Sequence, residues 1–127
     1  MRIGILTAGG DAPGMNAAIR AIVRKGWAVH GAEMLGFRNG WRGVMDGDVR
    51  ELTKESVQGI LHLGGTILGS SGADPYHEGG TAKVRRTFAD LALDGLIAIG
   101  GEGTLAAAAH MTEEGLPVVG VPKTIDN

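Results

Sequence analysis

The sequence predicts an α/β fold, with an open, mostly parallel sheet and helices on both faces in three α/β/α layers. Strand-like and helix-like patterns alternate with a repeat of roughly 20–30 residues, as in βαβ units. The strand patterns are continuous apolar runs, which is typical of parallel strands buried on both faces. Glycines, of which the chain has 23, stand where these runs end and permit sharp turns or close approach to a ligand. The 127 residues fit one domain, residues 1–127.

In the first half of the chain, two predicted strands flank a helix. Residues 2–8 form an apolar run that ends at a Gly-Gly pair, and they predict a buried strand. After a loop at 11–16, apolar residues recur at helical spacing over 17–23, with basic residues on the opposite face. Residues 32–37 predict a second strand. Residues 38–53 are rich in turn residues and predict only short pieces of structure.

The second half continues the alternation of strands and helices. Because ligands bind outside the carboxyl ends of the strands in open parallel sheets, the turns that follow the strands should converge on one cleft. The predicted elements are a short helix at 56–63, a glycine-rich loop at 64–75, a helix at 80–93, a strand at 95–99, an alanine-rich helix at 104–112 and a strand at 117–121.

Composition and charge exclude several classes of function. Lys and Arg number 12 and Asp and Glu number 14, so the formal charge of −2 lacks the basic footprint of nucleic-acid or membrane-surface binding. The absence of cysteine excludes disulfide scaffolds, thiolate metal sites and thiol catalysis. No apolar stretch approaches the roughly 18 residues of a membrane helix, and the apolar start is too short for a signal peptide. We therefore expect a soluble cytoplasmic protein with no nucleic-acid or membrane partner.

Two glycine-rich turns lead from a predicted strand into a helix. The turn Gly9–Asn16 could bring backbone N–H groups up to a phosphate, or it could be only a tight turn. It matches neither the dinucleotide fingerprint nor the Walker loop. In Gly100–Thr104, Glu102 is a candidate Mg²⁺ ligand beside a phosphate, or it serves only the helix dipole. Thr104 is a candidate helix cap that also donates to the phosphate. Two such turns favour phosphate binding.

Two further segments carry candidate chemistry. In Pro122–Asn127, Asp126 is a candidate general base for a hydroxyl, Lys123 a partner for a phosphate and Thr124 a hydrogen-bonding contact for a substrate. For six residues alone, a solvated loop is the favoured interpretation. Gly64–Ser71 could wrap an anion as a backbone nest or could be a flexible surface loop, and the pattern leaves both open.

Taken together, four segments resemble the N-terminal part of the 6-phosphofructokinase family. They occur in the family's order and spacing across essentially the whole chain, and the first and last together are highly specific. A GGDG-like turn alone would also fit lipid or NAD kinases. The segments are GGDAPGMNAAIR (Gly9–Arg20), GGTILGSS (Gly64–Ser71), GGEGT (Gly100–Thr104) and PKTIDN (Pro122–Asn127).

The resemblance implies transfer of a phosphoryl group from ATP to the 1-hydroxyl of fructose 6-phosphate, giving fructose 1,6-bisphosphate in glycolysis, with Mg²⁺. Residues 1–127 would form the donor-binding α/β domain, the N-terminal portion of a longer kinase whose second half supplies most of the sugar-phosphate site. Asp126 would be the general base, Thr124 and Lys123 would join it in contacting the substrate, and Glu102 would hold the metal. The donor would lie against Gly10, Gly72, Ala73, Gly101, Glu102, Gly103 and Thr104.

Three positions bear on the phosphoryl donor that the resemblance implies. In the family, a glycine after the acid leaves room for a nucleotide and an aspartate there goes with pyrophosphate, so Gly103 favours ATP. A lysine at the position of Lys123 is common among pyrophosphate users, and pyrophosphate is the less favoured donor. Many members carry an arginine that neutralises the transferring phosphate where this chain has Gly72 followed by alanine. Lys123 would compensate in part as a point charge.

The missing arginine and the short chain favour one alternative, a non-catalytic module that binds Mg-nucleotide or phosphate. We expect the isolated chain to bind nucleotide weakly and to turn over little or nothing. The resemblance also implies a homo-oligomer, a tetramer in full-length members. Arg20 and Arg24 match positions where bacterial relatives bind an allosteric nucleotide, and Lys54 stands where some of them have an arginine.

Overall fold

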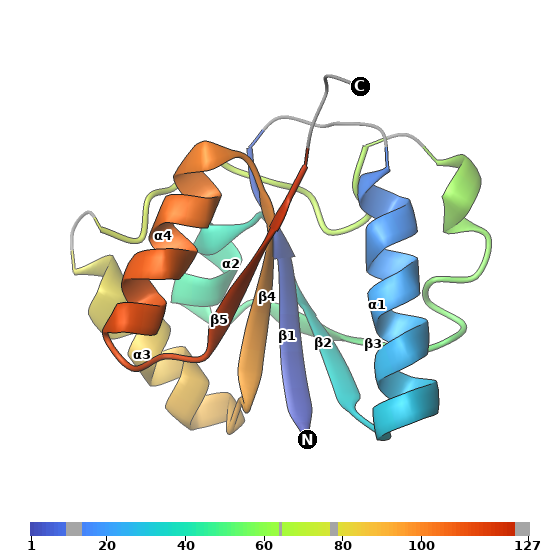
Figure 1. The fold of residues 1–127 in the computed structure, drawn as a ribbon, viewed down its shortest axis with the longest axis horizontal. Helices are drawn as coiled ribbons and strands as arrows, with labels where there is room; N and C mark the ends of the chain where they lie inside the picture. Colours follow the sequence, from blue (N-terminus) through green and yellow to red (C-terminus); the bar gives the residue numbers. More distant parts are fainter. Residues whose placement is uncertain (10–13, 64, 77–78, 124–127) are drawn as a thin grey trace.

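A computed structural model of the chain describes residues 1–9, 14–63, 65–76 and 79–123. Within these ranges the chain forms a five-stranded sheet with helices packed against it (Figure 1). Its elements are β1 (Arg2–Thr7), α1 (Met15–His30), β2 (Glu33–Phe37), α2 (Trp41–Asp46), β3 (Val49–Leu52), the 3₁₀ turn η1 (Ile60–His62), α3 (Gly80–Leu91), β4 (Gly95–Gly100), α4 (Glu102–Glu113) and β5 (Val118–Pro122).

The strand order of the sheet is β3-β2-β1-β4-β5. β1 is the central strand and pairs in parallel with β2 on one side and with β4 on the other. β5 continues the parallel arrangement beyond β4, whereas β3 runs antiparallel to β2 at the opposite edge. The chain therefore builds outward from β1 in one direction and then returns to build outward in the other. The order reverses between β1 and β4.

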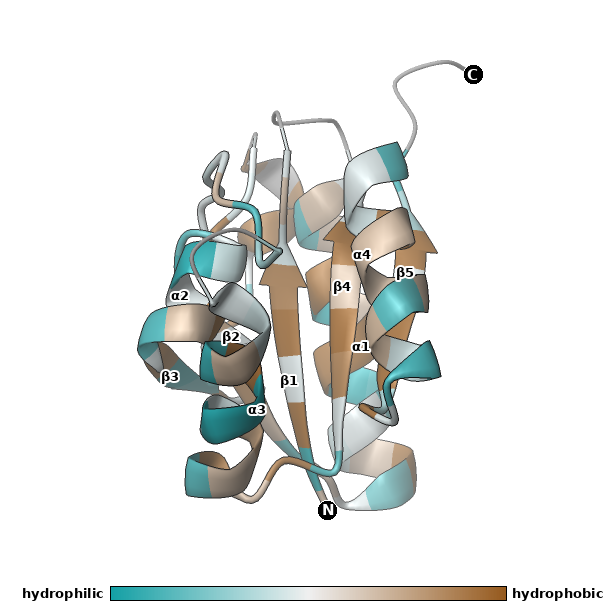
Figure 2. Cartoon of the chain, turned by 90° about the vertical axis from the view of Figure 1, so that its left-hand side faces the viewer, coloured by the Kyte–Doolittle hydropathy of each residue, from teal (hydrophilic) through white to brown (hydrophobic). Residues whose placement is uncertain are grey.

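The two faces of the sheet are buried by different helices, which confirms the predicted three layers. Leu6 of β1 is fully buried in a core that α2, α3 and α4 cover. Its neighbour Ile5 is fully buried in a second core, with Ile19 and Val23 of α1. Adjacent strand residues point to opposite faces, so continuous apolar strands supply both cores. Figure 2 shows the apolar strands between helices that turn polar residues outward.

The segment after β2 contains two elements that the sequence pattern did not reveal, α2 and the antiparallel strand β3. α2 is only six residues long and is flanked by Gly40 and Gly47. Its sequence is therefore too short to show helical spacing, and its glycines are typical of turns. Its Gly43 packs directly against the backbone of Arg38, where a side chain would collide with the carbonyl oxygen. β3 is a four-residue edge strand with two charged residues, which leaves too little apolar pattern to detect.

The predicted helix at 56–63 is wrong, because the segment is mostly turn and only Ile60–His62 are helical, as a 3₁₀ turn. Val57 and Ile60 are nevertheless buried in the core beneath α1, which explains the apolar pattern. In the part of the chain that the structure describes, no helix combines the length and the apolar character needed to cross a membrane.

Candidate functional site

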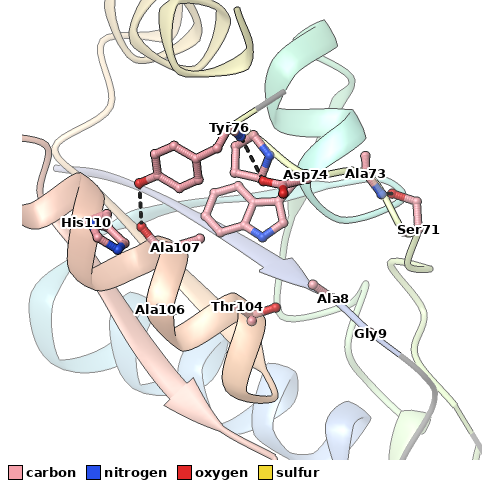
Figure 3. Close-up of a pocket in the computed structure, with 14 residues that line it drawn as sticks. Ala8, Gly9, Ser71, Ala73, Asp74, Tyr76, Thr104, Ala106, Ala107 and His110 are labelled. Carbon is pink, nitrogen blue, oxygen red and sulfur yellow. Dashed lines mark hydrogen bonds between the residues drawn. The ribbon is translucent and has the colours of Figure 1, made fainter. Parts of the chain in front are cut away.

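A cavity of about 380 Å³ opens at the carboxyl ends of β1 and β4, where the strand order reverses (Figure 3). Open α/β sheets bind ligands at this kind of position, because the loops that follow the two strands diverge to opposite faces and leave a crevice between them. The residues that line the cavity are Ala8, Gly9, Trp41, Ser71, Gly72, Ala73, Asp74, Pro75, Tyr76, Gly103, Thr104, Ala106, Ala107 and His110.

The beginning of α4 forms one side of this cavity. Gly101 caps the helix in an extended conformation, and the first turn contains Glu102, Gly103 and Thr104. The first intrahelical hydrogen bond runs from the Leu105 amide to the Gly101 carbonyl, 3.0 Å. The amides before Leu105 therefore have no intrahelical acceptor, and they carry the positive end of the helix dipole. This turn is suited to an anionic ligand.

The expectation that Thr104 caps α4 is wrong, because Gly101 takes that position and no side chain caps the helix. Thr104 instead belongs to the first turn, where it is buried and lines the cavity. Gly103 lines the cavity as well and is exposed. A methyl group added to Gly103 would meet no atom within 4 Å, so the space beside this position is open.

Glu102 is exposed in the first turn of α4, one residue before the lining residue Gly103. Among the described residues no three His, Cys, Asp or Glu side chains gather into a metal cage. Mg²⁺ commonly takes one or two carboxylates and completes its shell with waters and substrate phosphates. A single exposed carboxylate beside a turn suited to an anion fits that coordination. Glu102 could therefore hold Mg²⁺ together with a bound phosphate.

The end of β1 meets a lysine that arrives from β5. The Ala8 amide donates to the Ile99 carbonyl, 2.9 Å, and the Lys123 amide donates to the Gly100 carbonyl, 2.9 Å. A Cβ atom placed on Gly9 would lie 3.1 Å from the Lys123 Nζ. The ammonium of Lys123 is therefore beside the exit of β1, across the end of the intervening strand. Gly10, Thr124 and Asp126, which the sequence analysis singled out, lie outside the described residues.

Residues 71–76 form the wall of the cavity that faces α4, and this segment contains the predicted donor-binding residues Gly72 and Ala73. Two side chains fix its path. The Ser71 hydroxyl donates to the Asn39 carbonyl, 2.7 Å, and the Tyr76 amide donates to the Asp74 carboxylate, 2.8 Å. Gly72 is exposed, and nothing lies within 4 Å of where its side chain would be.

Tyr76 closes the cavity against α4, and the sequence analysis did not identify it. Its hydroxyl donates to the Ala107 carbonyl, 3.2 Å, and its ring meets the His110 ring edge-on at 5.7 Å between centroids (Figure 3). Partial burial, followed by the negative charges of Glu114, Asp74 and Glu113, raises the pKa of Tyr76 above 10.0. The phenol therefore stays neutral and able to donate at ordinary pH.

Trp41 and His110 also line the cavity and were missed. For His110 a signal was present in the sequence. Thr104, Ala107 and His110 follow one another at three-residue intervals, which places them along one face of a helix. For Trp41 no such signal existed, since it depends on the short helix α2. The cavity thus has aromatic rings in one part and the beginning of a helix in another.

In the segment Gly65–Ser71, three backbone amides are used inside the protein, and Gly64 lies outside the described residues. The Ile67 amide donates to the Asn16 side chain, 2.8 Å, and the Leu68 amide to the Thr66 hydroxyl, 3.2 Å. The Gly69 amide donates to the Thr66 carbonyl, 3.3 Å. These backbone donors are used inside the protein and are not available to a ligand. The segment leads into residues 71–76, which line the cavity.

A second hollow of about 360 Å³ lies away from the cavity, between α1 and the segment after β3. It is lined by Arg20, Arg24, Lys54, Glu55 and Gln58. Three cations against one carboxylate make it a positively charged surface. The structure thus brings together Arg20, Arg24 and Lys54, which the sequence analysis had grouped on the basis of the resemblance.

Comparison with known proteins agrees with this architecture. Residues 2–127 match the family model described as phosphofructokinase. The chain is 59% identical to a pyrophosphate–fructose 6-phosphate 1-phosphotransferase of Amycolatopsis methanolica. It is 53% identical to ATP-dependent 6-phosphofructokinase 3 of Streptomyces coelicolor. Each alignment covers 100% of this chain but only 38% of the relative. The crystal structure of Pichia pastoris phosphofructokinase in the T-state superposes with a TM-score of 0.91 at 32% identity, covering 99% of this chain and 15% of that one.

Proposed function

Because the chain belongs to the phosphofructokinase family, we propose that it forms the phosphoryl-donor side of an enzyme that phosphorylates the 1-hydroxyl of fructose 6-phosphate. The observation that carries the proposal is the cavity at the reversal of strand order, where the exit of β1 faces the first turn of α4. That arrangement suits the phosphates of a donor, because unpaired amides and a helix dipole point toward negative charge.

ATP is the proposed donor. Its support comes from Gly103, which leaves the first turn of α4 open, and from a cavity large enough for a nucleotide with aromatic residues in its wall. Relatives named for pyrophosphate and for ATP both match the whole chain. Pyrophosphate therefore stays the alternative donor. Mg²⁺, held by Glu102 and the donor phosphates, would neutralise charge on those phosphates.

The proposed roles follow from the chemistry of phosphoryl transfer. The hydroxyl oxygen of the sugar attacks the terminal phosphorus, the bond to the leaving phosphate oxygen breaks, and Asp126 accepts the hydroxyl proton. Lys123 would balance negative charge on the transferring group and Thr124 would hold the sugar. Gly10, Gly101 and the other donor-side residues named above would line the phosphates and would leave the backbone close to them.

The test is a chimera in which residues 1–127 replace the matching segment of the Amycolatopsis methanolica relative, assayed for fructose 1,6-bisphosphate with ATP and with pyrophosphate in turn. The proposal expects product with ATP, and loss of turnover without loss of ATP binding in Asp126→Ala. A folded chimera that forms no product with either donor would contradict it. The matched control is the unmodified relative, expressed and assayed in parallel.

One observation favours a second function, a Mg-nucleotide-binding module without turnover. Gly72 brings no guanidinium to the cavity wall, and such a charge would stabilise the transition state. Under this alternative the chimera binds Mg-ATP, yields no product, and binds equally well with Asp126→Ala. The same two measurements therefore separate the two functions.

We also propose an effector site and a subunit assembly, both of which the resemblance implies. The hollow formed by Arg20, Arg24 and Lys54 would take a phosphorylated effector. The parent enzyme would be a cytoplasmic homo-oligomer. Arg24→Ala in the chimera would remove the response to a nucleoside diphosphate and leave the donor affinity unchanged.

A further inference from the structure

Thr7 is the last residue of β1, and its side chain is fully buried. Its hydroxyl donates to the Gly69 carbonyl, 2.8 Å, and lies 2.9 Å from the Thr66 hydroxyl. A hydroxyl has one proton, so Thr7 uses its own on Gly69 and accepts the proton of Thr66. Thr66 in turn accepts from the Leu68 amide, 3.2 Å. The hydroxyls thus form a satisfied chain that ties β1 to a segment about 60 residues away in sequence.

The segment that Thr7 holds leads directly into the cavity wall. Gly69 precedes Ser71, where the wall of residues 71–76 begins. Gly40 also packs against both segments. A Cβ atom placed on Gly40 would lie 3.0 Å from the Thr7 carbonyl oxygen and 3.5 Å from the Ser71 nitrogen. Gly40 therefore lies between the end of β1 and the start of the wall, and a side chain there would be tight against the Thr7 carbonyl oxygen.

Other contacts hold the same segment from different elements. The Asn16 side chain of α1 donates to the Leu63 carbonyl, 3.1 Å, and accepts from the Ile67 amide. The Asn39 amide donates to the Leu68 carbonyl, 2.9 Å. Thr7 differs from these because it lies on β1, whose next residues Ala8 and Gly9 line the cavity. Its hydroxyl couples one side of the cavity to the other.

We infer that Thr7 is a positioning residue for the donor cavity. It is not among the residues that line the cavity, and it acts through Gly69 by fixing the separation between the exit of β1 and the wall at 71–76. The inference rests on the proposed donor-binding function. If residues 71–76 moved away from the exit of β1, they would lose contact with a bound donor. The affinity for the donor would then fall, because ligand affinity depends on a preformed site.

The test uses the 127-residue chain with three variants. Thr7→Val keeps the size and removes the hydroxyl, whereas Thr7→Ser keeps the hydroxyl. The matched control is Thr87→Val. Thr87 is likewise a buried threonine whose hydroxyl donates to a carbonyl, that of Val44 at 2.5 Å, but it joins α3 to α2 rather than β1 to the wall.

The first measurement is hydrogen exchange at the backbone amides of residues 67–73. Thr7→Val should accelerate exchange there, Thr7→Ser should restore protection, and Thr87→Val should leave these amides unchanged. This measurement needs no ligand. An unchanged pattern in Thr7→Val would overturn the inference, as would equal acceleration in Thr87→Val, since both would show that the hydroxyl does not specifically position the segment.

The second measurement is the affinity for Mg-ATP and for Mg-pyrophosphate, by titration calorimetry. Thr7→Val should weaken binding about tenfold, while Thr7→Ser and Thr87→Val should bind as the parent chain does. Equal weakening by both valine variants would overturn the inference, because a general loss of stability would then explain it. Binding of neither donor by the parent chain would contradict the proposed function, whereas the exchange measurement would still decide the positioning of the wall.

Discussion

Tyr76 is the single tyrosine of the chain, so its ionisation reports directly on the cavity wall. Partial burial against α4 raises its pKa above the ordinary value of 10.0, and the negative charges of Glu114, Asp74 and Glu113 act in the same direction. A raised pKa means that the folded state favours the neutral phenol. The stability that this contributes is present below the ordinary pKa and is lost as the pH rises through the folded pKa.

A titration of phenolate absorbance should therefore give a midpoint above 10.0 for the folded chain. The same chain unfolded in urea should titrate at the ordinary tyrosine value of about 10. Equal midpoints in the two states would show that Tyr76 does not pack against α4 as described.

Gly72 lies in the cavity wall with open space where a side chain would project. Gly72→Arg should place a guanidinium beside the bound donor and tighten Mg-ATP binding about fivefold, about 1 kcal/mol. Titration calorimetry measures the change. The control is Ala89→Arg, which adds the same charge at an exposed position of α3 outside the cavity lining. If the control tightened binding equally, net charge would be the cause and the position of Gly72 would be irrelevant.

At the scale of single residues, the structure brings together part of the set that the sequence singled out for the donor. Gly72, Ala73, Gly103 and Thr104 come from two distant segments, and the structure brings all four to one cavity. Sequence reasoning could not identify Tyr76, because its contact with α4 depends on the path of a loop that no local pattern encodes. The catalytic assignment of Asp126 stays a prediction, since that residue lies outside the described ranges.

At the scale of elements, α2 includes one very close backbone approach. The absent side chain of Gly43 lets the helix pack onto the Arg38 backbone, and a methyl group there would collide with the carbonyl oxygen. Gly43→Ala should therefore lower the free energy of unfolding by about 2–3 kcal/mol, measured by urea denaturation.

Gly103→Ala is the matched control for that substitution. It also places a methyl group on a helical glycine, but with nothing within 4 Å. It should raise the free energy of unfolding by about 0.5–1 kcal/mol, because alanine loses less backbone entropy on folding. Equal effects of the two substitutions would contradict the packing described for α2.

The longer elements could be predicted from sequence, because apolar runs and helical spacing persist over enough residues to be distinctive. β1, β2, β4, β5, α3 and α4 all fall within a few residues of their predicted ranges, and α1 includes its predicted range but continues to His30. Short elements could not be predicted in the same way. α2 and β3 are specified by tertiary packing against the sheet, and the buried Val57 and Ile60 produced a helical pattern in a segment that is mostly turn.

At the scale of the whole molecule, the location of the cavity follows from topology. The chain leaves β1 toward β2 and later returns to β4 on the other side of β1. The loops that follow β1 and β4 therefore diverge from the carboxyl ends of these two neighbouring strands. The parallel character of the sheet was predictable from its continuous apolar strands. The strand order was not, because pairing between strands distant in sequence leaves no local signal.

The central claim is that this chain binds a phosphoryl donor in the cavity between β1 and α4. The most direct measurement is a titration of the isotope-labelled chain with Mg-ATP, and separately with Mg-pyrophosphate, followed by the backbone amide resonances. The account predicts saturable shifts at Gly9, Gly72 and Gly103 with at least one of these donors. Shifts confined to the hollow of Arg20 and Arg24, or no shifts with either donor, would contradict it.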